Sequence, residues 1–157
     1  MVTWGTFRSM RPDLADAGRE HLYRFGVGLA FLATVRPDGG PRLHPMCPVL
    51  EDDGLYAFLI PSPKRDDLHR DGRYAIHCYP PDDNEDAFYV TGLARAVVDE
   101  PAIVERLRSR FFEERGWTSP PDGFDEQELF EFDVQTCLVT VTTGHGDPHP
   151  DHTVWRA

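Results

Sequence analysis

The stretch VGLAFLATVRPDGGPRLHPMCPVLEDDGLYAFLI, residues 27–60, decides the fold. It holds three strand-like segments, at 27–35, 42–51 and 55–60. The stretch 36–41 between the first two carries Pro, Asp and Gly, and the stretch 52–54 between the last two carries Asp and Gly. Pro fixes φ, Asp tolerates the left-handed region and Gly adopts positive φ, so both stretches predict tight turns. Three strands joined by two such turns predict an antiparallel meander.

The rest of the chain continues this mainly β pattern with helices between the strands. Apolar periodicity and end signals predict helices and strands in turn. The helices are expected at 12–25, 62–71 and 101–116, the strands at 73–79, 87–98 and 128–142, and a loop at 143–153. Gly92 interrupts one long strand and predicts a bulge. Six antiparallel strands with flanking helices predict a barrel-like sheet of the α+β class, with residues 1–157 as one domain.

Composition narrows the range of partners. The chain is 40% hydrophobic and 27% charged, as in ordinary globular domains, and its net charge is −11. Nucleic acids and anionic membranes require a positive surface, so neither is expected as a partner. No apolar run is long enough to span a bilayer and the first residues lack the layout of a signal peptide, so a cytoplasmic location is expected.

The cysteines and histidines do not predict a metal site. Three cysteines without a C-x-x-C spacing are expected to be reduced core residues. His145, His149 and His152 lie near Asp147 in a proline-containing segment that cannot form a helix. We interpret them as a solvated loop, so no bound metal is predicted.

Ser62-Pro63-Lys64-Arg65 is the segment that carries chemistry. Ser at the N-cap and Pro at the first helical position predict a helix start, whose free N–H groups attract anions. Lys64, the only lysine of the chain, and Arg65 stand in that first turn, where a phosphate would neutralise them. The alternative is that Asp66 and Asp67 neutralise the turn and that Lys64 points into solvent.

Five elements in order resemble the pyridoxamine 5′-phosphate oxidase-like, FMN-binding split-barrel family. They are the strand Leu32–Val35, the hairpin Asp38-Gly39-Gly40-Pro41-Arg42-Leu43-His44-Pro45, the strand at Leu55-Tyr56, the helix start Ser62–Leu68 and the strand at Arg73–Ala75. The resemblance covers residues 27–98 well and extends more loosely toward the C-terminus. It implies a split β-barrel that works as a homodimer with FMN at the interface.

The resemblance also assigns site residues. It implies that Arg42 and Lys64 bind the FMN phosphate and that the Ser62 hydroxyl assists, with Arg65 as a further donor. An Arg fork, a Lys point charge and helix amides together suit a dianionic phosphate. Cys47 stands where the oxidase itself carries a lysine, and Ala87 stands where it carries a flavin-contacting glutamine. The resemblance therefore predicts the cofactor, FMN, more clearly than it predicts the substrate, and it does not establish vitamin B6 as the substrate.

Three further residues are candidate flavin contacts. His44 either donates to an isoalloxazine oxygen or is a strand residue bonded to backbone. Trp155-Arg156 resembles the Trp-Arg pair that closes over the flavin edge in relatives; otherwise Trp155 packs in a surface groove.

The expected function is a flavin-dependent oxidoreductase that acts on a small molecule, with no catalytic residue identified in the sequence. Relatives of the same fold that use the deazaflavin F420, haem-related relatives and a flavin-binding module without turnover are the alternatives.

Overall fold

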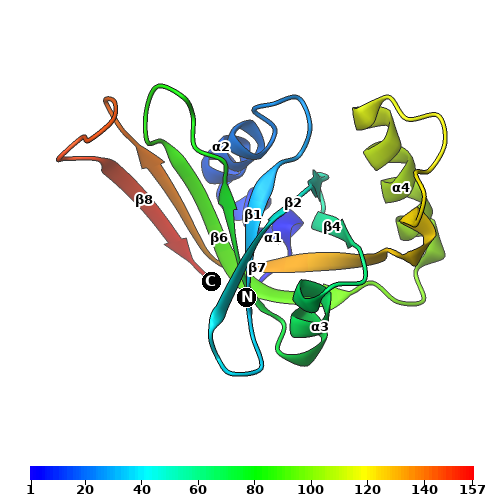
Figure 1. Cartoon of the computed structure of the whole chain (residues 1–157). Helices are drawn as coiled ribbons and strands as arrows, with labels where there is room; N and C mark the ends of the chain where they lie inside the picture. The colour runs from blue at the N-terminus through cyan, green and yellow to red at the C-terminus, as the bar shows by residue number, and fades with distance from the viewer.

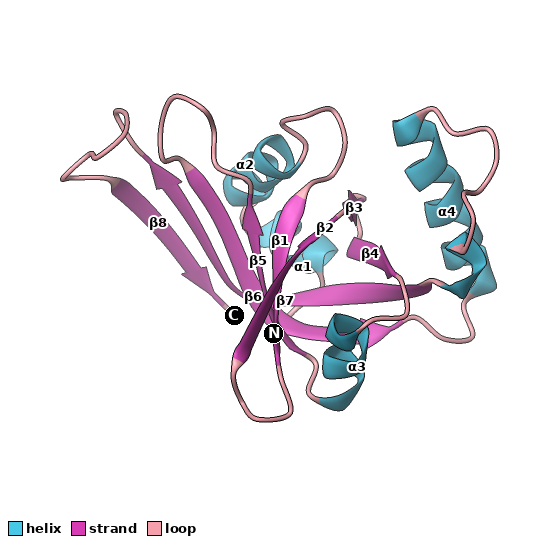
Figure 2. Cartoon of the chain, viewed as in Figure 1, coloured by secondary structure: helices cyan, strands magenta, loops and turns pink.

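The computed structural model describes residues 1–157 as one curled antiparallel sheet with four helices (Figures 1 and 2). The strands are β1 Ala30–Val35, β2 Pro41–Met46, β3 Pro48–Leu50, β4 Leu55–Leu59, β5 Arg73–Cys78, β6 Ala87–Ala96, β7 Glu128–Val141 and β8 Asp151–Arg156. The helices are α1 Trp4–Met10, α2 Pro12–Leu22, α3 Pro63–Arg70 and α4 Pro101–Arg115, with a 3₁₀ turn at Phe124–Glu126. The predicted mainly β, α+β class is confirmed.

The sheet has eight strands in place of the six expected. Its order is β2-β1-β5-β6-β7-β4-β3, and β8 pairs with β7. The segment predicted as one strand over 42–51 divides at Cys47 into β2 and β3, which lie at opposite edges of the sheet. β3 begins at Pro48, which has no backbone N–H to donate. A proline is therefore tolerated in an edge strand such as β3 but not in the centre of a sheet.

β8 is the other strand that the pattern did not predict. Five of its six residues are exposed, so it has no apolar alternation to detect, and it is held by its pairing with β7 from Thr136↔Arg156 to Val141↔Asp151. The predicted bulge at Gly92 is confirmed, since the β6–β7 register shifts between Thr91 and Gly92. A Cβ at Gly92 would lie 1.8 Å from the carbonyl oxygen of Asp133, which explains why this position is glycine.

Two hydrophobic clusters stabilise the fold. The larger one, of 24 buried residues, fills the barrel and joins α1 and α2 to the strands. The smaller one, of 7 buried residues, packs α4 on β3 and β4 and includes Leu107 and Phe111. Figure 1 shows α4 standing at one end of the molecule.

The helices contact the inner side of the sheet and leave the other side bare. Trp4 of α1 packs on Phe88, and Asp67 of α3 bonds Thr34, and both partners are buried residues of the inner side. The strand registers place a second set of residues on the opposite side, which we call the outer sheet face. Its residues include Phe31, Ala33, Leu43, Ala75, Tyr89, Thr91, Leu93, Thr136, Leu138, Val154 and Arg156.

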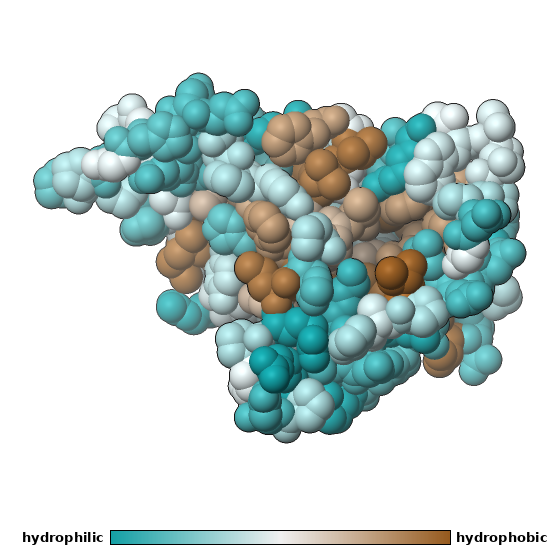
Figure 3. All heavy atoms as spheres, in the orientation of Figure 1, coloured by the Kyte–Doolittle hydropathy of each residue, from teal (hydrophilic) through white to brown (hydrophobic).

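The outer sheet face exposes large apolar side chains. Leu43, Leu93 and Val154 are 62%, 40% and 40% exposed. In Figure 3 apolar residues gather as brown patches over the middle of the view, around β2, β4 and the loop between α2 and β1, while the β7–β8 hairpin is hydrophilic. No helix combines the length and hydrophobicity that crossing a bilayer requires.

Candidate anion-binding site

α3 begins as the sequence predicts, with Ser62 as N-cap and Pro63 at the first helical position. The backbone N–H groups of Arg65 and Asp66 both donate to the carbonyl oxygen of Ser62. The N–H of Lys64 lies before the first residue that finds an acceptor within the helix, so it remains one of the free donors of this helix end. The turn thus retains a group suited to an anion.

Asp67 is the centre of a buried cluster beside this turn. Its side chain is 2% exposed, and its Oδ2 accepts hydrogen bonds from Thr34 Oγ1 at 2.8 Å and from Arg42 Nε at 2.7 Å. Its Oδ1 accepts from Arg70 Nη1 at 3.1 Å. Burial acts to raise the pKa of Asp67, but the hydrogen bonds from Arg42, Thr34 and Arg70 outweigh it and hold the pKa below the usual range.

Arg42 therefore reaches from β2 to α3 and is joined there through a single nitrogen. Its Nε bonds Asp67, while neither of its two terminal nitrogens donates within the chain. The guanidinium keeps the fork that recognises phosphate in bidentate geometry. Arg42 thus bonds a residue that lies one helical turn along α3 from Lys64.

Lys64 is half-buried, and its ammonium takes part in no ion pair or hydrogen bond of the chain. Burial lowers the pKa of Lys64, against a smaller opposing effect of Cys47. In the alternative, Asp66 and Asp67 neutralise the turn and Lys64 points into solvent; the structure shows that Asp67 does not pair with Lys64, because its carboxylate is engaged by Arg42 and Arg70. Asp66 is exposed and pairs with neither cation.

Ser62 and Arg65 are placed differently from the expectation. The Ser62 hydroxyl donates to the carbonyl oxygen of Ile60 at 2.8 Å and makes no capping bond. Arg65 Nη1 donates to the carbonyl oxygen of Glu126 at 3.0 Å, and its Nε lies 3.3 Å from Glu128 Oε2. Arg65 is consequently neutralised by Glu128, whereas Lys64 has no ion-pair partner and Arg42 shares Asp67 with Arg70.

His44 lies on β2 opposite Leu32, on the same side of the sheet as Arg42. Its ring is exposed and makes no hydrogen bond to backbone, which was the alternative to a ligand contact. One residue, Leu43, separates it from Arg42, so the two side chains lie next to each other along one face of the strand.

Trp155 and Arg156 lie away from this site within one chain. Four strands separate β8 from β2 in the sheet. The ring of Trp155 packs on Phe7 of α1, with 4.9 Å between the ring centroids. Arg156 points to the outer sheet face opposite Thr136.

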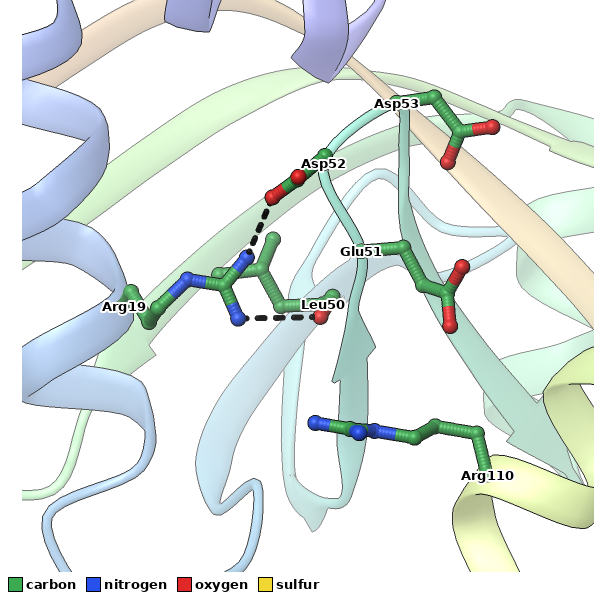
Figure 4. Close-up of a pocket in the computed structure, with 6 residues that line it drawn as sticks. All are labelled: Arg19, Leu50, Glu51, Asp52, Asp53 and Arg110. Carbon is green, nitrogen blue, oxygen red and sulfur yellow. Dashed lines mark hydrogen bonds and ion pairs between the residues drawn. The ribbon is translucent and has the colours of Figure 1, made fainter.

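The cavities of the single chain lie elsewhere. One of about 450 Å³ lies between α2, the β3–β4 turn and α4 (Figure 4). Its lining is mostly charged, and Arg19 there donates to the carbonyl oxygen of Leu50 at 3.4 Å and to Asp52 at 3.3 Å. Another, of about 280 Å³, lies on the outer sheet face over Ala33, Ala75 and Thr91. Neither these nor the two other sizeable cavities are lined by Arg42, Ser62 or Lys64, so these residues lie at an open surface in the single chain.

The three cysteines carry no disulfide, and the C-terminal histidines form no cluster. Cys78 and Cys137 are buried, Cys47 is half-buried, and all three are free. His145 bonds the backbone of Asp82, and no group of three or more His, Cys, Asp or Glu side chains is arranged to hold a metal ion.

Sequence reasoning missed the part of Asp67 in this site. It treated Asp67 only as a neutraliser of Lys64, whereas the structure shows it bound to Arg42. A usable signal was present: Asp67 adjoins Leu68, the one apolar residue of α3, and so lies at the edge of the face that the helix buries.

Comparison with solved structures identifies the fold. A pyridoxamine 5′-phosphate oxidase-related, FMN-binding protein from Nostoc punctiforme is similar at a TM-score of 0.61 and 18% identity, covering 92% of this chain and 95% of that one. An F420 reductase is similar at a TM-score of 0.56 and 24% identity, covering 74% and 92%. An FAD-binding protein from Mesorhizobium loti is similar at a TM-score of 0.56 and 18% identity, covering 69% and 82%. No family model matches the sequence.

Proposed function

We propose that this chain, which has the split-barrel fold of pyridoxamine 5′-phosphate oxidase-related and F420 reductase proteins, binds FMN and acts as a flavin-dependent oxidoreductase on a small molecule. The observation that carries the proposal is an excess of positive charge beside a free helix N-terminus in a molecule of net charge −11: Lys64 has no counter-ion, and Arg42 shares the single carboxylate of Asp67 with Arg70. A buried or half-buried cation without a counter-ion is costly, and a phosphate removes that cost.

The residues present fit a phosphomonoester. Two terminal nitrogens of Arg42, the ammonium of Lys64 and the N–H of Lys64 supply donors from two sides. When bound, FMN supplies hydride transfer at its ring, and the protein binds and orients it. Arg65 is not among the phosphate ligands that we propose in the conformation described, because its charge is met by Glu128. Ser62 joins them only if its hydroxyl rotates away from Ile60.

We also propose that two chains associate as a homodimer. The outer sheet face carries large exposed apolar residues, and solvation of such a face is unfavourable. The open position of Arg42 and Lys64 in one chain is consistent with a site that the second chain completes. Arg156 lies on the outer sheet face and is the candidate contribution of the partner.

Titration with FMN tests the proposal, with riboflavin as the matched ligand that lacks the phosphate. We expect the flavin fluorescence of FMN to be quenched when FMN binds, and we expect riboflavin to bind at least tenfold more weakly than FMN. Lys64→Glu should abolish tight FMN binding, whereas Arg24→Glu, the same charge change at an exposed residue, should leave it unchanged. Equal affinities for FMN and riboflavin would refute the phosphate assignment.

The F420 reductase similarity supports a second candidate, an F420-dependent reductase. Titration with F420 separates the two, since the preferred cofactor binds at the lower concentration. A bound flavin that no nicotinamide or other reductant reduces would indicate a binding module without turnover.

A further inference from the structure

We infer that Asp67 is a positioning residue: it fixes the Arg42 guanidinium through Nε, so that both terminal nitrogens face the phosphate of the bound cofactor. The inference rests on the proposed function, because it concerns the same site. It goes beyond that function by assigning a role to a carboxylate that would otherwise only repel an anion.

The geometry of the contact is selective. A guanidinium can meet a carboxylate through two terminal nitrogens or through Nε. Arg42 uses Nε, at 2.7 Å from Asp67 Oδ2, and keeps the terminal pair free. The fork is therefore set by the protein before a ligand arrives, which reduces the conformational entropy lost on binding.

The carboxylate itself is fixed from other sides. Thr34 of β1 donates to the same Oδ2 at 2.8 Å, and Arg70 donates to Oδ1 at 3.1 Å. Thr34 is 3% exposed and Asp67 2%, so both groups are held in the packed interior. Asp67 thus has little freedom to follow Arg42 if the arginine moves.

Arg70 has a different part in the cluster. One of its terminal nitrogens donates to Asp67, and the other donates to the carbonyl oxygen of Val35. Both terminal nitrogens of Arg70 are therefore engaged within the chain. Two guanidinium groups meet one carboxylate here, which leaves one positive charge in excess. Because both terminal nitrogens of Arg70 are already bonded within the chain, that excess charge is offered to a ligand through Arg42.

Asp67→Asn separates positioning from simple charge, because the two effects have opposite signs. Removal of a negative charge near a phosphate should strengthen FMN binding if Asp67 acts only by its charge. If it positions Arg42, FMN affinity should fall about tenfold while riboflavin affinity stays within twofold. A purely structural loss would weaken both ligands together, so the ratio of the two dissociation constants is the diagnostic readout.

Arg42→Lys is the second variant and keeps the charge. One ammonium cannot bond Asp67 and present a planar fork at the same time, so we expect a similar phosphate-specific loss. In the Arg42→Lys background Asp67→Asn should add little, because the two residues act through one contact. Asp71→Asn, which removes a carboxylate at the exposed end of α3, is the matched control and should change neither affinity.

The outcomes distinguish the two claims. Wild-type protein that does not prefer FMN to riboflavin overturns the proposed function and this inference with it. Wild-type protein that prefers FMN, together with an Asp67→Asn variant of equal or higher FMN affinity, overturns only the positioning role. If Asp67→Asn does not fold by circular dichroism, Arg42→Lys decides: retained preference for FMN overturns the inference, and lost preference supports it.

Discussion

Lys64 and Asp67 lie one turn apart on α3 and do not pair, because the Asp67 carboxylate accepts from Arg42 and Arg70. Residues at this spacing on a helix are neighbours, and opposite charges there usually stabilise it. In this protein the carboxylate is committed to the interior and the ammonium remains available at the surface.

The first prediction concerns the titration of Lys64. Burial lowers its pKa below the ordinary value of 10.5, and a bound phosphate should raise it again because it favours the charged form. FMN binding is then coupled to proton uptake, so affinity should fall as pH rises through the pKa of the free protein. Since Lys64 is the only lysine, ¹³C reductive methylation gives one side-chain signal to follow by NMR. The N-terminal amine is the internal control, and a Lys64 signal that FMN does not move would contradict the assignment.

The second prediction concerns Trp155, which the structure packs on Phe7. Trp155→Ala should lower the free energy of unfolding by about 2–4 kcal/mol, since large aromatic truncations in cores cost of this order. Trp155→Phe should recover most of it. Urea denaturation measures both. A Trp155→Ala protein of normal stability that no longer binds flavin would instead support the role that the sequence resemblance implied, in which Trp155 closes over the edge of the flavin ring.

The third prediction concerns the bulge. Gly92→Ala would place a Cβ 1.8 Å from a backbone oxygen, so the strands must separate locally, and we expect a loss of about 3 kcal/mol or more. Gly39→Ala is the control, with φ of +83° and no atom within 4 Å of the added carbon. Its cost should be about 1 kcal/mol, from the left-handed backbone alone. Similar thermal unfolding of the two variants would show that β6 and β7 yield easily at Gly92.

The fourth prediction concerns Tyr23, which joins α2 to α4. Its hydroxyl accepts from the N–H of Leu50 at 2.9 Å and lies 3.1 Å from Glu114 Oε1, to which it donates. Burial raises the pKa of Tyr23 from 10.0 to about 12. The folded protein thus holds this proton where the unfolded chain releases it, so the contribution is complete below pH 10 and is lost between pH 10 and about 12.

Tyr23→Phe tests that linkage directly. At pH 8 it should cost about 1–3 kcal/mol, because buried polar partners lose their hydrogen bond. Above pH 10 the stability difference between wild type and variant should narrow by up to about 1.4 kcal/mol per pH unit. Urea midpoints at pH 8, 10 and 11 give the curve. A difference that stays constant over this range would mean that the hydroxyl is not shielded.

Much of the fold was accessible from sequence because its signals are local. The turns at 36–41 and 52–54, the Ser-Pro helix start and Gly92 each act through backbone geometry of a few residues, and each is confirmed. The break at Cys47 was not accessible, since the apolar pattern runs on across it and only the sheet order shows that β2 and β3 part. β8 was missed because it is exposed and depends on β7 for its hydrogen bonds.

The residues of the candidate site can likewise be divided into those that local sequence signals predict and those that only the tertiary structure brings together. Lys64 stood out because a lone lysine in an acidic chain is visible in the sequence. The partner of Arg42 was not, because Asp67 comes 25 residues later and only the tertiary fold brings them together. Arg65 looked equivalent to Lys64 in sequence, but Glu128, distant along the chain, neutralises it.

The single residue between β2 and β3 also limits how far these two strands can move apart. Cys47 alone joins one sheet edge to the other, so the end of β2 at Met46 and the start of β3 at Pro48 can lie at most about 7 Å apart. The Cys47 end of β2 therefore cannot move away from β3, whereas Arg42 lies at the opposite end of β2, next to the β1–β2 hairpin, which no such link restrains. A ligand bound at Arg42 should accordingly be accommodated by movement of that hairpin and not by separation of β2 from β3.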